Sequence, residues 1–516
     1  MTTPQTQTRD VALATIHRLE PLVDAWQKRP EAVEIEQVTE LIHAYGQVGR
    51  GPDAEALFTW LCEATPVTPQ WLEEQPGLAE VRGASRYPSL LAKVQEETKL
   101  AERIWGPQHY PYVAKLPLTE RLFGLSLVWS ELKYGFPHFD KVPDLDWDQA
   151  YRDAIPEVTA AEDTLTYYRV LKRLVARLQE GHTHVAYPWD LVDQTRRRPA
   201  FLTELVENRV LVTELAEGAE LPAEIRVGSE ILAIDGVPVL QYAAEQVAPY
   251  FGASTPQSVR KSIFQMGVLE GPLDKPINLQ VAAADGVRHA VQVRRGKDHA
   301  FPRPALSWRR IGEMGYIAIN TFGDRLTEEA VAEAVAALKD SKGLIIDVRK
   351  NGGGNSGWWV VGHLAPEYYK TPWAVRAYRP VLRPWGWPRL TWYEEPAKLE
   401  TSEQQPRYAG PVVVLAGAAT ASAAEDFLAA FKAAKRGPIF GQASSGATGQ
   451  PLLKGLPGGG YVRFCVKRDR TPDGQPIVGR GIPADRTILP TVDDIRSGFD
   501  RPLQAALQHL AEAASL

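Results

Sequence analysis

The chain has 516 residues, of which 58 are basic and 63 acidic, giving a formal net charge of −5, and 44% are hydrophobic. This length allows about three or four domains and excludes a peptide module or a disulfide-stapled mini-protein. The balanced charge is typical of an ordinary globular chain and argues against nucleic acid as a partner. The N-terminus shows no secretory core region, and no stretch approaches 18 consecutive apolar residues. We therefore expect a cytoplasmic protein that binds no membrane.

Two cysteines, Cys62 and Cys465, are far apart in the sequence and have no metal-ligand partners at zinc-site spacing. The sequence therefore predicts neither a disulfide framework nor a metal site, and we expect no cofactor. Both thiols are expected to be buried as small apolar groups.

Helical periodicity dominates the first 185 residues. Apolar residues at i, i+4, i+7, i+11 and i+14 are Leu118, Leu122, Leu125, Trp129 and Leu132. The proline-containing stretch from Thr65 to Pro76 suggests a break between an outer and an inner helical piece. We expect an N-terminal helical region of unknown role at 1–90 and a helical domain at 91–195.

The period changes near residue 200. Asn208–Glu214 is predicted to be a strand, and Asp235-Gly236 follows an apolar strand as a tight turn. The segment Val227–Gly236 resembles a strand pair of PDZ domains, which bind peptide ends by strand addition. A PDZ-like β-rich domain is therefore expected at 196–300, with Ile277–Val281 and His289–Val293 as its last strands.

Strands and helices alternate over residues 301–516. The predicted elements are the strands Met314–Ile319, Gly343–Val348 and Pro411–Leu415 and the helices Glu328–Leu338 and Asp426–Lys435. This alternation predicts a largely parallel sheet covered on its faces. An aromatic insertion at 356–408 is expected to have irregular structure and to form a lid or wall.

Small residues separate a buried strand from a helix in the window Val412–Glu425. Ser422 falls near the first turn of that helix, where unpaired N–H groups favour developing negative charge. An alternative is that Thr420 or Ser422 only caps the helix.

Three glycines, Gly352 to Gly354, directly follow another buried strand. Their bare backbone can direct N–H groups at an oxyanion. Phosphate binding fits poorly because no P-loop spacing follows, whereas a flexible turn remains an alternative.

The run Glu180-Gly181-His182-Thr183-His184 ends a predicted helix. A histidine beside glycine lies where the chain turns sharply, so its imidazole can project into a cleft. Either histidine could instead be an ordinary surface or core residue. Metal binding lacks a third ligand at suitable spacing.

These windows together resemble the C-terminal processing (tail-specific) and tricorn-like serine peptidase family. The run from Gly479 to Asp485 (GRGIPAD) is similar to that family's G-x-G-(V/I)-x-P-D segment. The resemblance covers roughly residues 100–510. It implies an α/β multidomain fold: an N-terminal helical region, a PDZ-like β-rich domain and a C-terminal α/β, crotonase-like peptidase core at 301–516.

The resemblance implies that Ser422 is the nucleophile and that backbone N–H groups of Gly353, Gly354 and Ala423 form the oxyanion hole. One branch of the family uses a lysine 25 residues after the serine, but that position is Ala447 here, and no lysine lies between Arg436 and Leu453.

The other branch uses a histidine, which matches His182, together with a glutamate whose position here is Val478. A neutral imidazole is a suitable base near pH 7. Glu180, Glu425 or Asp485 could orient this histidine.

The sequence therefore predicts a serine peptidase that acts on peptides or proteins through an acyl-enzyme, and the family implies that copies of the chain can form homo-oligomers. One alternative is a catalytically silent peptide- or ligand-binding protein on the same scaffold. Another is a small-molecule esterase or amidase whose pocket is shaped by the insertion. Tryptophans that could line such a pocket are Trp358, Trp359, Trp373, Trp385, Trp387 and Trp392.

Overall fold

The computed structural model describes residues 4–28, 35–65, 67–105, 109–297, 301, 303–376 and 392–514. The chain forms two compact units, Met1–Gln108 and His109–Leu516. The first unit extends past the predicted boundary at residue 90, because α6 (Tyr87–Trp105) runs continuously through that position. Within the described ranges, no helix is both long and apolar enough to cross a membrane.

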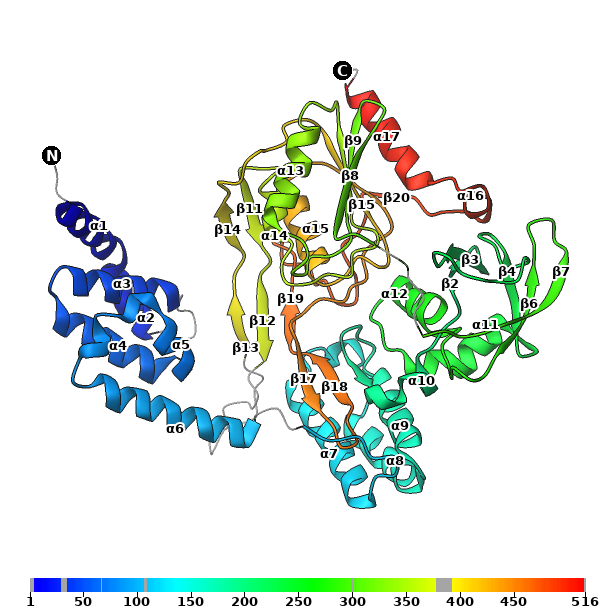
Figure 1. Cartoon of the computed structure of the whole chain (residues 1–516), viewed down its shortest axis with the longest axis horizontal. Helices are drawn as coiled ribbons and strands as arrows, with labels where there is room; N and C mark the ends of the chain where they lie inside the picture. The colour runs from blue at the N-terminus through cyan, green and yellow to red at the C-terminus, as the bar shows by residue number, and fades with distance from the viewer. Residues whose placement is uncertain are drawn as a thin grey trace. The chain divides into compact units, whose positions relative to one another are not determined.

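In its described residues, the first unit is built from helices (Figure 1). They are α1 (Pro4–Leu19), α2 (Val23–Lys28), α3 (Ile35–Gln47), α4 (Gly51–Ala64), α5 (Pro69–Glu74) and α6. Leu41, Phe58 and Leu61 are among the buried residues of one shared core, which also encloses Cys62 as predicted. The predicted break after Thr65 holds the short helix α5, so it separates two helices of one core.

The second unit begins with a helical region made of α7 (Leu118–Gly135), α8 (Trp147–Ala160) and α9 (Thr164–Ala176). Leu125 and Leu132 of the predicted apolar series are fully buried, whereas Leu118 is 42% exposed because it begins α7. A three-stranded sheet packs on these helices. Its order is β1 (His184–Ala186), β18 (Tyr461–Cys465) and β17 (Pro451–Gly455), so a C-terminal hairpin completes this region.

A sheet lobe follows, with five antiparallel strands in the order β2-β3-β4-β6-β7 and β5 (Val237–Pro238) beside β4 (Figure 1). The five strands are β2 (Phe201–Val206), β3 (Arg209–Leu215), β4 (Glu230–Ile234), β6 (Ile277–Ala282) and β7 (Arg288–Val293). Asp235 and Gly236 both have positive φ, 47° and 84°, as a two-residue hairpin turn requires. The helices α11 (Val239–Tyr242) and α12 (Pro256–Lys261) belong to the same lobe.

The C-terminal region contains a six-stranded sheet, parallel except for the β8–β9 pair. Its order is β20 (Arg486–Thr487), β16 (Ile439–Gly441), β15 (Val412–Ala416), β10 (Leu344–Asp347), β9 (Met314–Ile319) and β8 (Leu306–Ile311). The predicted mostly parallel sheet is therefore present in the structure.

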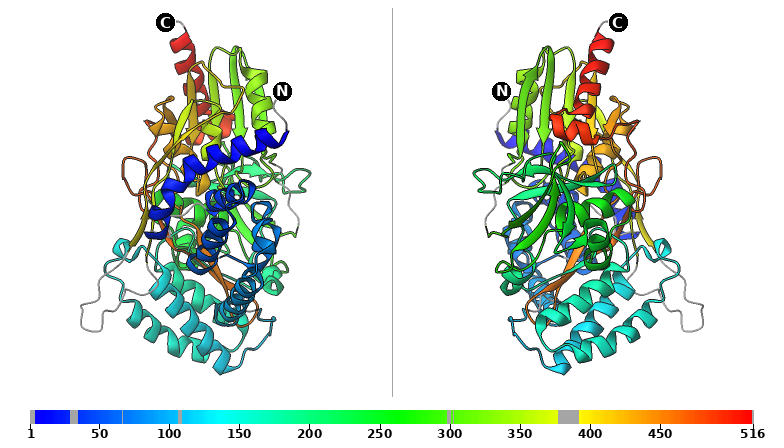
Figure 2. Two further views of the ribbon diagram at one scale, coloured as in Figure 1. Left: turned by 90° about the vertical axis from the view of Figure 1, so that its left-hand side faces the viewer. Right: turned by 90° about the vertical axis from the view of Figure 1, so that its right-hand side faces the viewer.

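Both faces of this sheet are covered (Figure 2). On one face α13 (Glu328–Leu338), α14 (Trp358–Val361) and α15 (Ala423–Ala433) pack against Ile346 and Val414. On the other face α17 (Arg501–Ala514), which follows α16 (Val492–Ser497), packs against Ile345 and Val413. Because neighbouring residues of one strand face opposite layers, the central strands are continuous apolar runs.

The aromatic insertion is not irregular, contrary to prediction. β11 (Glu367–Lys370) pairs with β14 (Lys398–Thr401), and β12 (Trp373–Arg376) pairs with both β13 (Trp392–Glu395) and β19 (Lys467–Asp469). Aromatic residues favour strands, and exposure alternates along β11, as expected of a half-exposed ladder. Trp385 and Trp387 lie outside the described residues.

Candidate active site

Two turns meet at the carboxyl ends of β10 and β15, which are adjacent parallel strands. Thr420 Oγ1 donates to the Val348 carbonyl at 2.8 Å, and the Ala421 N–H donates to the Asn351 carbonyl at 3.1 Å. These bonds tie the turn Thr420–Ser422, called the serine turn below, to the turn Asn351–Gly354, called the glycine turn. The carboxyl ends of strands are where α/β folds build their sites.

Ser422 occupies the N-cap of α15 with a φ of 56°. This backbone conformation is costly for a residue other than glycine, and comparable strain is found at nucleophiles on strand–turn–helix elements. Its N–H donates to the Ala447 carbonyl at 2.8 Å and to Glu425 Oε2 at 3.2 Å. Thr420, the other candidate cap, instead bridges the two turns.

The Glu425 carboxylate is hydrogen-bonded to the serine turn and to the neighbouring loop at 444–447. It is fully buried and, besides the Ser422 N–H, accepts hydrogen bonds from Ser444 Oγ at 2.6 Å and from the N–H groups of Gly446 at 2.7 Å and Ala447 at 2.9 Å. Burial raises the pKa of Glu425 to about 7, although these hydrogen bonds act to lower it. The side chain therefore orders the loop beside Ser422.

The glycine turn lies against Ser422. A Cβ added to Gly353 would stand 2.6 Å from Ser422 Cβ, so a side chain does not fit there. The Gly353 N–H donates to Asn351 Oδ1 at 2.8 Å and is therefore already used. Among the described residues, no acceptor is found for the N–H groups of Gly354 and Ala423.

The turn Glu180–Thr183, called the histidine turn below, brings a second buried carboxylate beside His182. Glu180 accepts from the His182 N–H at 3.0 Å and from Thr183 Oγ1 at 2.7 Å, and its Oε1 lies 3.6 Å from His182 Nδ1. Burial acts to raise the pKa of Glu180, but the interactions with His182 and the charge of His138 outweigh it and lower the pKa to about 2. Glu180 is thus an anion next to the imidazole.

The serine and histidine turns, far apart in sequence, meet at Ala447. Its carbonyl accepts the Ser422 N–H, and a Cβ added to Gly181 would lie 2.8 Å from its methyl group. A lysine side chain at position 447 would occupy the space that the histidine turn fills. The absence of the lysine and the close approach of Gly181 to Ala447 are therefore two aspects of one arrangement.

Of the three acidic residues predicted to orient His182, only Glu180 contacts it among the described residues. Glu425 is bonded to the serine turn, and Asp485 accepts from Lys432 Nζ at 2.6 Å and from the Ile439 N–H at 2.9 Å. Val478 is buried and apolar. Asp485 therefore fixes the start of β16 and not His182.

Three structural residues of the site escaped the sequence prediction. Asn351 is fully buried and shapes the glycine turn, and Ser444 links Glu425 to the Ile482 N–H at 2.6 Å. His138 is buried, and its Nε2 lies 3.7 Å from Cys465 Sγ. Of these three residues, only Asn351 could have been predicted from the sequence. It precedes the glycines, and an asparagine side chain often accepts a hydrogen bond from the backbone N–H two residues later.

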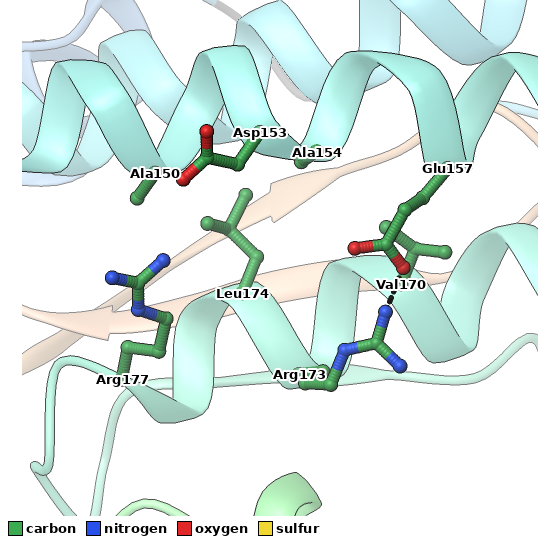
Figure 3. A pocket seen from close by; sticks show the side chains of 8 residues that line it. All are labelled: Ala150, Asp153, Ala154, Glu157, Val170, Arg173, Leu174 and Arg177. Carbon is green, nitrogen blue, oxygen red and sulfur yellow. Dashed lines mark hydrogen bonds and ion pairs between the residues drawn. The ribbon is translucent and has the colours of Figure 1, made fainter.

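A cavity elsewhere contains none of the predicted site residues (Figure 3). It has a volume of about 60 Å³ between α8 and α9 and is lined in part by Arg173 and Arg177. Within the described part of the chain, no group of three or more His, Cys, Asp or Glu side chains could hold a metal ion.

Comparison with known proteins identifies a protein family that matches part of the chain. Residues 313–488 match the model of peptidase family S41, a segment that includes Ser422 and the glycine turn. The chain contains a peptidase family S41 domain. The predicted family resemblance is thereby confirmed, and the match supports the serine-type peptidase class. Glu180 and His182 lie outside the S41 match.

A curated relative is a probable CtpA-like serine protease of Staphylococcus haemolyticus (strain JCSC1435), 23% identical over 247 residues. The alignment covers 45% of this chain and 46% of that protein, so it spans about half the length of the relative.

The fold of the chain is similar to that of two solved structures. Mature CPAF complexed with lactacystin has a TM-score of 0.60 at 16% identity, over 77% of this chain and 98% of that one. Mature CPAF has a TM-score of 0.59 at 15% identity, over 77% and 97%. At these identities the likeness concerns the fold.

Proposed function

We propose that the protein is a serine peptidase in which Ser422 attacks a peptide carbonyl while His182 accepts its proton. The observation that carries the proposal is the meeting of the two turns at Ala447, with a bond of 2.8 Å on one side and direct contact with Gly181 on the other. This contact links a hydroxyl at a helix start to an imidazole from a distant segment.

In the proposed reaction, Ser422 Oγ forms a bond to the carbonyl carbon and gives a tetrahedral oxyanion. His182 then donates the proton to the leaving amine, which departs and leaves an acyl-enzyme. Water, deprotonated by the same imidazole, hydrolyses the ester. Glu180 acts as the group that orients His182 and stabilises its protonated form, as its position 3.6 Å from Nδ1 supports.

The oxyanion would be bound by the N–H groups of Gly354 and Ala423. Both lack acceptors in the described chain, whereas the N–H of Gly353 is used by Asn351. Gly353 then serves by lacking a side chain beside Ser422. Each donor in such a hole is typically worth about 10²–10³ in rate.

We further propose that the second unit comprises the helical domain, a PDZ-like domain at 196–300 and a crotonase-like core at 301–516. The five-stranded lobe with its two short helices supports the second assignment, and the sheet flanked on both faces supports the third. Peptides or proteins are the proposed substrates, and homo-oligomer formation stays a prediction.

Active-site labelling tests the proposal. A fluorophosphonate is expected to modify Ser422, and peptide mass spectrometry locates the label. Ser422→Ala is expected to abolish labelling and to lower the rate of casein hydrolysis at least about 10⁴-fold. His182→Ala is expected to slow both by about 10³-fold or more. An activated hydroxyl reacts because its base is close.

Exposed Ser497 and His109 provide matched controls, since Ser497→Ala and His109→Ala remove the same groups elsewhere. Labelling of another residue, or a Ser422→Ala variant with full hydrolytic rate, would contradict the proposal. A protein that remains unlabelled would be a silent binding protein, and one that cleaves p-nitrophenyl esters but no peptide would be an esterase.

A further inference from the structure

A chain of hydrogen bonds runs from β18 to the proposed catalytic base, and Thr183 lies in its middle. Thr183 Oγ1 accepts the Cys465 N–H at 3.2 Å and donates to Glu180 Oε2 at 2.7 Å. Glu180 Oε1 lies 3.6 Å from Nδ1 of His182. These contacts join a backbone group of a distant strand to the imidazole through one hydroxyl and one carboxylate.

The direction of each bond follows from the chemistry of the groups. A backbone N–H only donates, so it uses a lone pair of the Thr183 hydroxyl and leaves the single hydrogen of that hydroxyl for Glu180. The Glu180 carboxylate is ionised and only accepts, and a hydrogen bond to an ionised group is stronger than one between neutral groups. Both residues are 1% exposed, so water has little access to replace the hydroxyl.

The two oxygens of the Glu180 carboxylate are held by different groups. Oε1 accepts the His182 N–H at 3.0 Å, whereas Oε2 accepts from Thr183. The last torsion of a glutamate side chain is broad, so a bond to one oxygen alone leaves the carboxylate plane free to turn. Bonds to both oxygens fix the plane and keep Oε1 beside His182 Nδ1, which has no hydrogen-bond partner among the described residues. The approach of the carboxylate to the imidazole therefore depends on the Thr183 hydroxyl.

The Thr183 side chain extends the contact between the histidine turn and β18. The ladder between β1 and β18 ends on this side at the pair His184–Arg463. Two residues further along β18, the Cys465 N–H donates to Thr183 Oγ1. The hydroxyl thus adds one bond beyond the end of the ladder, at the residue that follows His182.

The donor of this bond is itself fixed in place. Cys465 is fully buried, and its Sγ lies 3.2 Å from the Lys467 carbonyl oxygen and 3.5 Å from that of Thr448. Thr448 directly follows the loop at 444–447, which is hydrogen-bonded to the serine turn. One continuous segment, from that loop through β17 and β18, therefore contacts both turns of the proposed site.

We propose that Thr183 is a positioning residue that orients the Glu180 carboxylate toward His182, and that β18 holds Thr183 in place through the Cys465 N–H. Thr183 acts on proton transfer through Glu180 and makes no contact with the reacting atoms. The inference rests on the proposed peptidase function, because it adds a residue to the machinery of that same site.

Removal of the hydroxyl tests this role. Thr183→Val keeps the shape of the side chain, and we expect kcat for a casein peptide to fall about tenfold with KM unchanged, because a displaced base slows only the chemical step. The rate constant for fluorophosphonate labelling of Ser422 is expected to fall by the same factor. Thr183→Ser retains the hydroxyl and should keep both rates within about threefold of wild type.

Thr203→Val is the matched control. Thr203 on β2 is also 1% exposed, and its hydroxyl donates to the Phe264 carbonyl within the sheet lobe. The same chemical change is therefore made at the same burial. We expect this variant to have a lower thermal midpoint, as Thr183→Val should, but to keep the wild-type kcat and labelling rate.

A double-mutant cycle separates positioning from a merely structural effect. In the Glu180→Ala background, the group through which Thr183 acts is gone, so Thr183→Val should lower kcat by less than about twofold further. Circular dichroism verifies the fold of each variant, and the comparison of Thr183→Val with Thr183→Ser does not depend on the Glu180→Ala protein.

A tenfold loss in both backgrounds, or a Thr183→Val protein with the wild-type kcat and labelling rate, would overturn the positioning role. Failure of the peptidase function gives a different result, namely absence of fluorophosphonate labelling at Ser422 in the wild-type protein, and it would overturn both proposals together.

Discussion

The serine turn and the histidine turn are built in opposite ways. Ser422 is held by its own strand, its own helix and Glu425 three residues on, with the neighbouring loop at 444–447 closing the arrangement. His182 belongs to a short turn whose local support is Glu180, and its position depends on contact with Ala447 from a distant part of the chain. One turn is locally specified and the other is specified by tertiary packing.

This difference has a consequence for the response to mutation. A change in the histidine turn should disturb catalysis while the S41 domain remains folded, because this turn lies outside the matched residues 313–488. A change beneath the serine turn should affect stability together with activity, because the buried Glu425 carboxylate accepts four hydrogen bonds.

The largest effect is expected at the contact between the turns. Gly181→Ala would place a methyl group 2.8 Å from the Ala447 methyl, closer than such groups approach. The turn must move, and a displacement of about 1 Å at a catalytic group can cost about 10²-fold in rate. We expect kcat/KM for casein peptides to fall ten- to a hundredfold, with little change in thermal midpoint.

The reciprocal change sharpens this test. Ala447→Gly removes the methyl group that the new side chain meets, so the double variant is expected to regain most of the lost activity. Gly51→Ala, where an added Cβ meets nothing within 4 Å, is the control for the substitution itself. Lack of rescue would show that the two turns are not coupled through this contact.

The next effect concerns the buried carboxylate. Glu425→Gln turns an NH₂ group toward backbone N–H donors, and we expect a loss of about 1–3 kcal/mol in stability. In the wild-type protein, the pKa of Glu425 is about 7 in the folded state against an ordinary 4.5, so its stabilising contribution is present below pH 4.5 and lost as the pH rises through 7.

The difference in unfolding free energy between wild type and Glu425→Gln is therefore expected to shrink by about 2–3 kcal/mol from pH 5 to pH 8. Urea unfolding followed by tryptophan fluorescence at both pH values measures it. Glu333→Gln, an exposed change on α13, should show no such pH dependence. A constant difference for Glu425→Gln would mean that this carboxyl does not titrate in that range.

The core of the fold could be predicted because its signals are local. The strand Met314–Ile319 and the helix Glu328–Leu338 have the predicted bounds, since burial on both faces produces continuous apolar strands and a one-sided helix stripe. The ladders β11–β14 and β12–β13 could not be predicted, because their partners are separated by a long insertion and their strands are half-exposed.

The same reasoning applies to the site. Ser422 and the glycine turn follow buried strands, so their position at one sheet edge can be inferred from sequence. The choice among Glu180, Glu425 and Asp485 could not, because it depends on which carboxylate tertiary packing brings to His182.

The smallest effect is expected where the sheet lobe touches the loop of the serine turn. Thr255 Oγ1 donates to the Ser445 carbonyl at 2.6 Å and caps α12 by accepting the Ser258 N–H at 3.3 Å. Thr255→Val removes both bonds and should lower stability by about 1 kcal/mol. Because Ser445 adjoins the partners of Glu425, we also expect kcat/KM to fall a few-fold.

Thr68→Val separates the two consequences of that change. Thr68 also precedes a proline and caps its helix, accepting the Trp71 N–H at 3.2 Å, but it lies in the first unit. Its loss should reduce stability without altering kcat/KM. Equal activity of the two variants would mean that the lobe does not help to order the serine turn, so that this turn is specified entirely within the S41 domain.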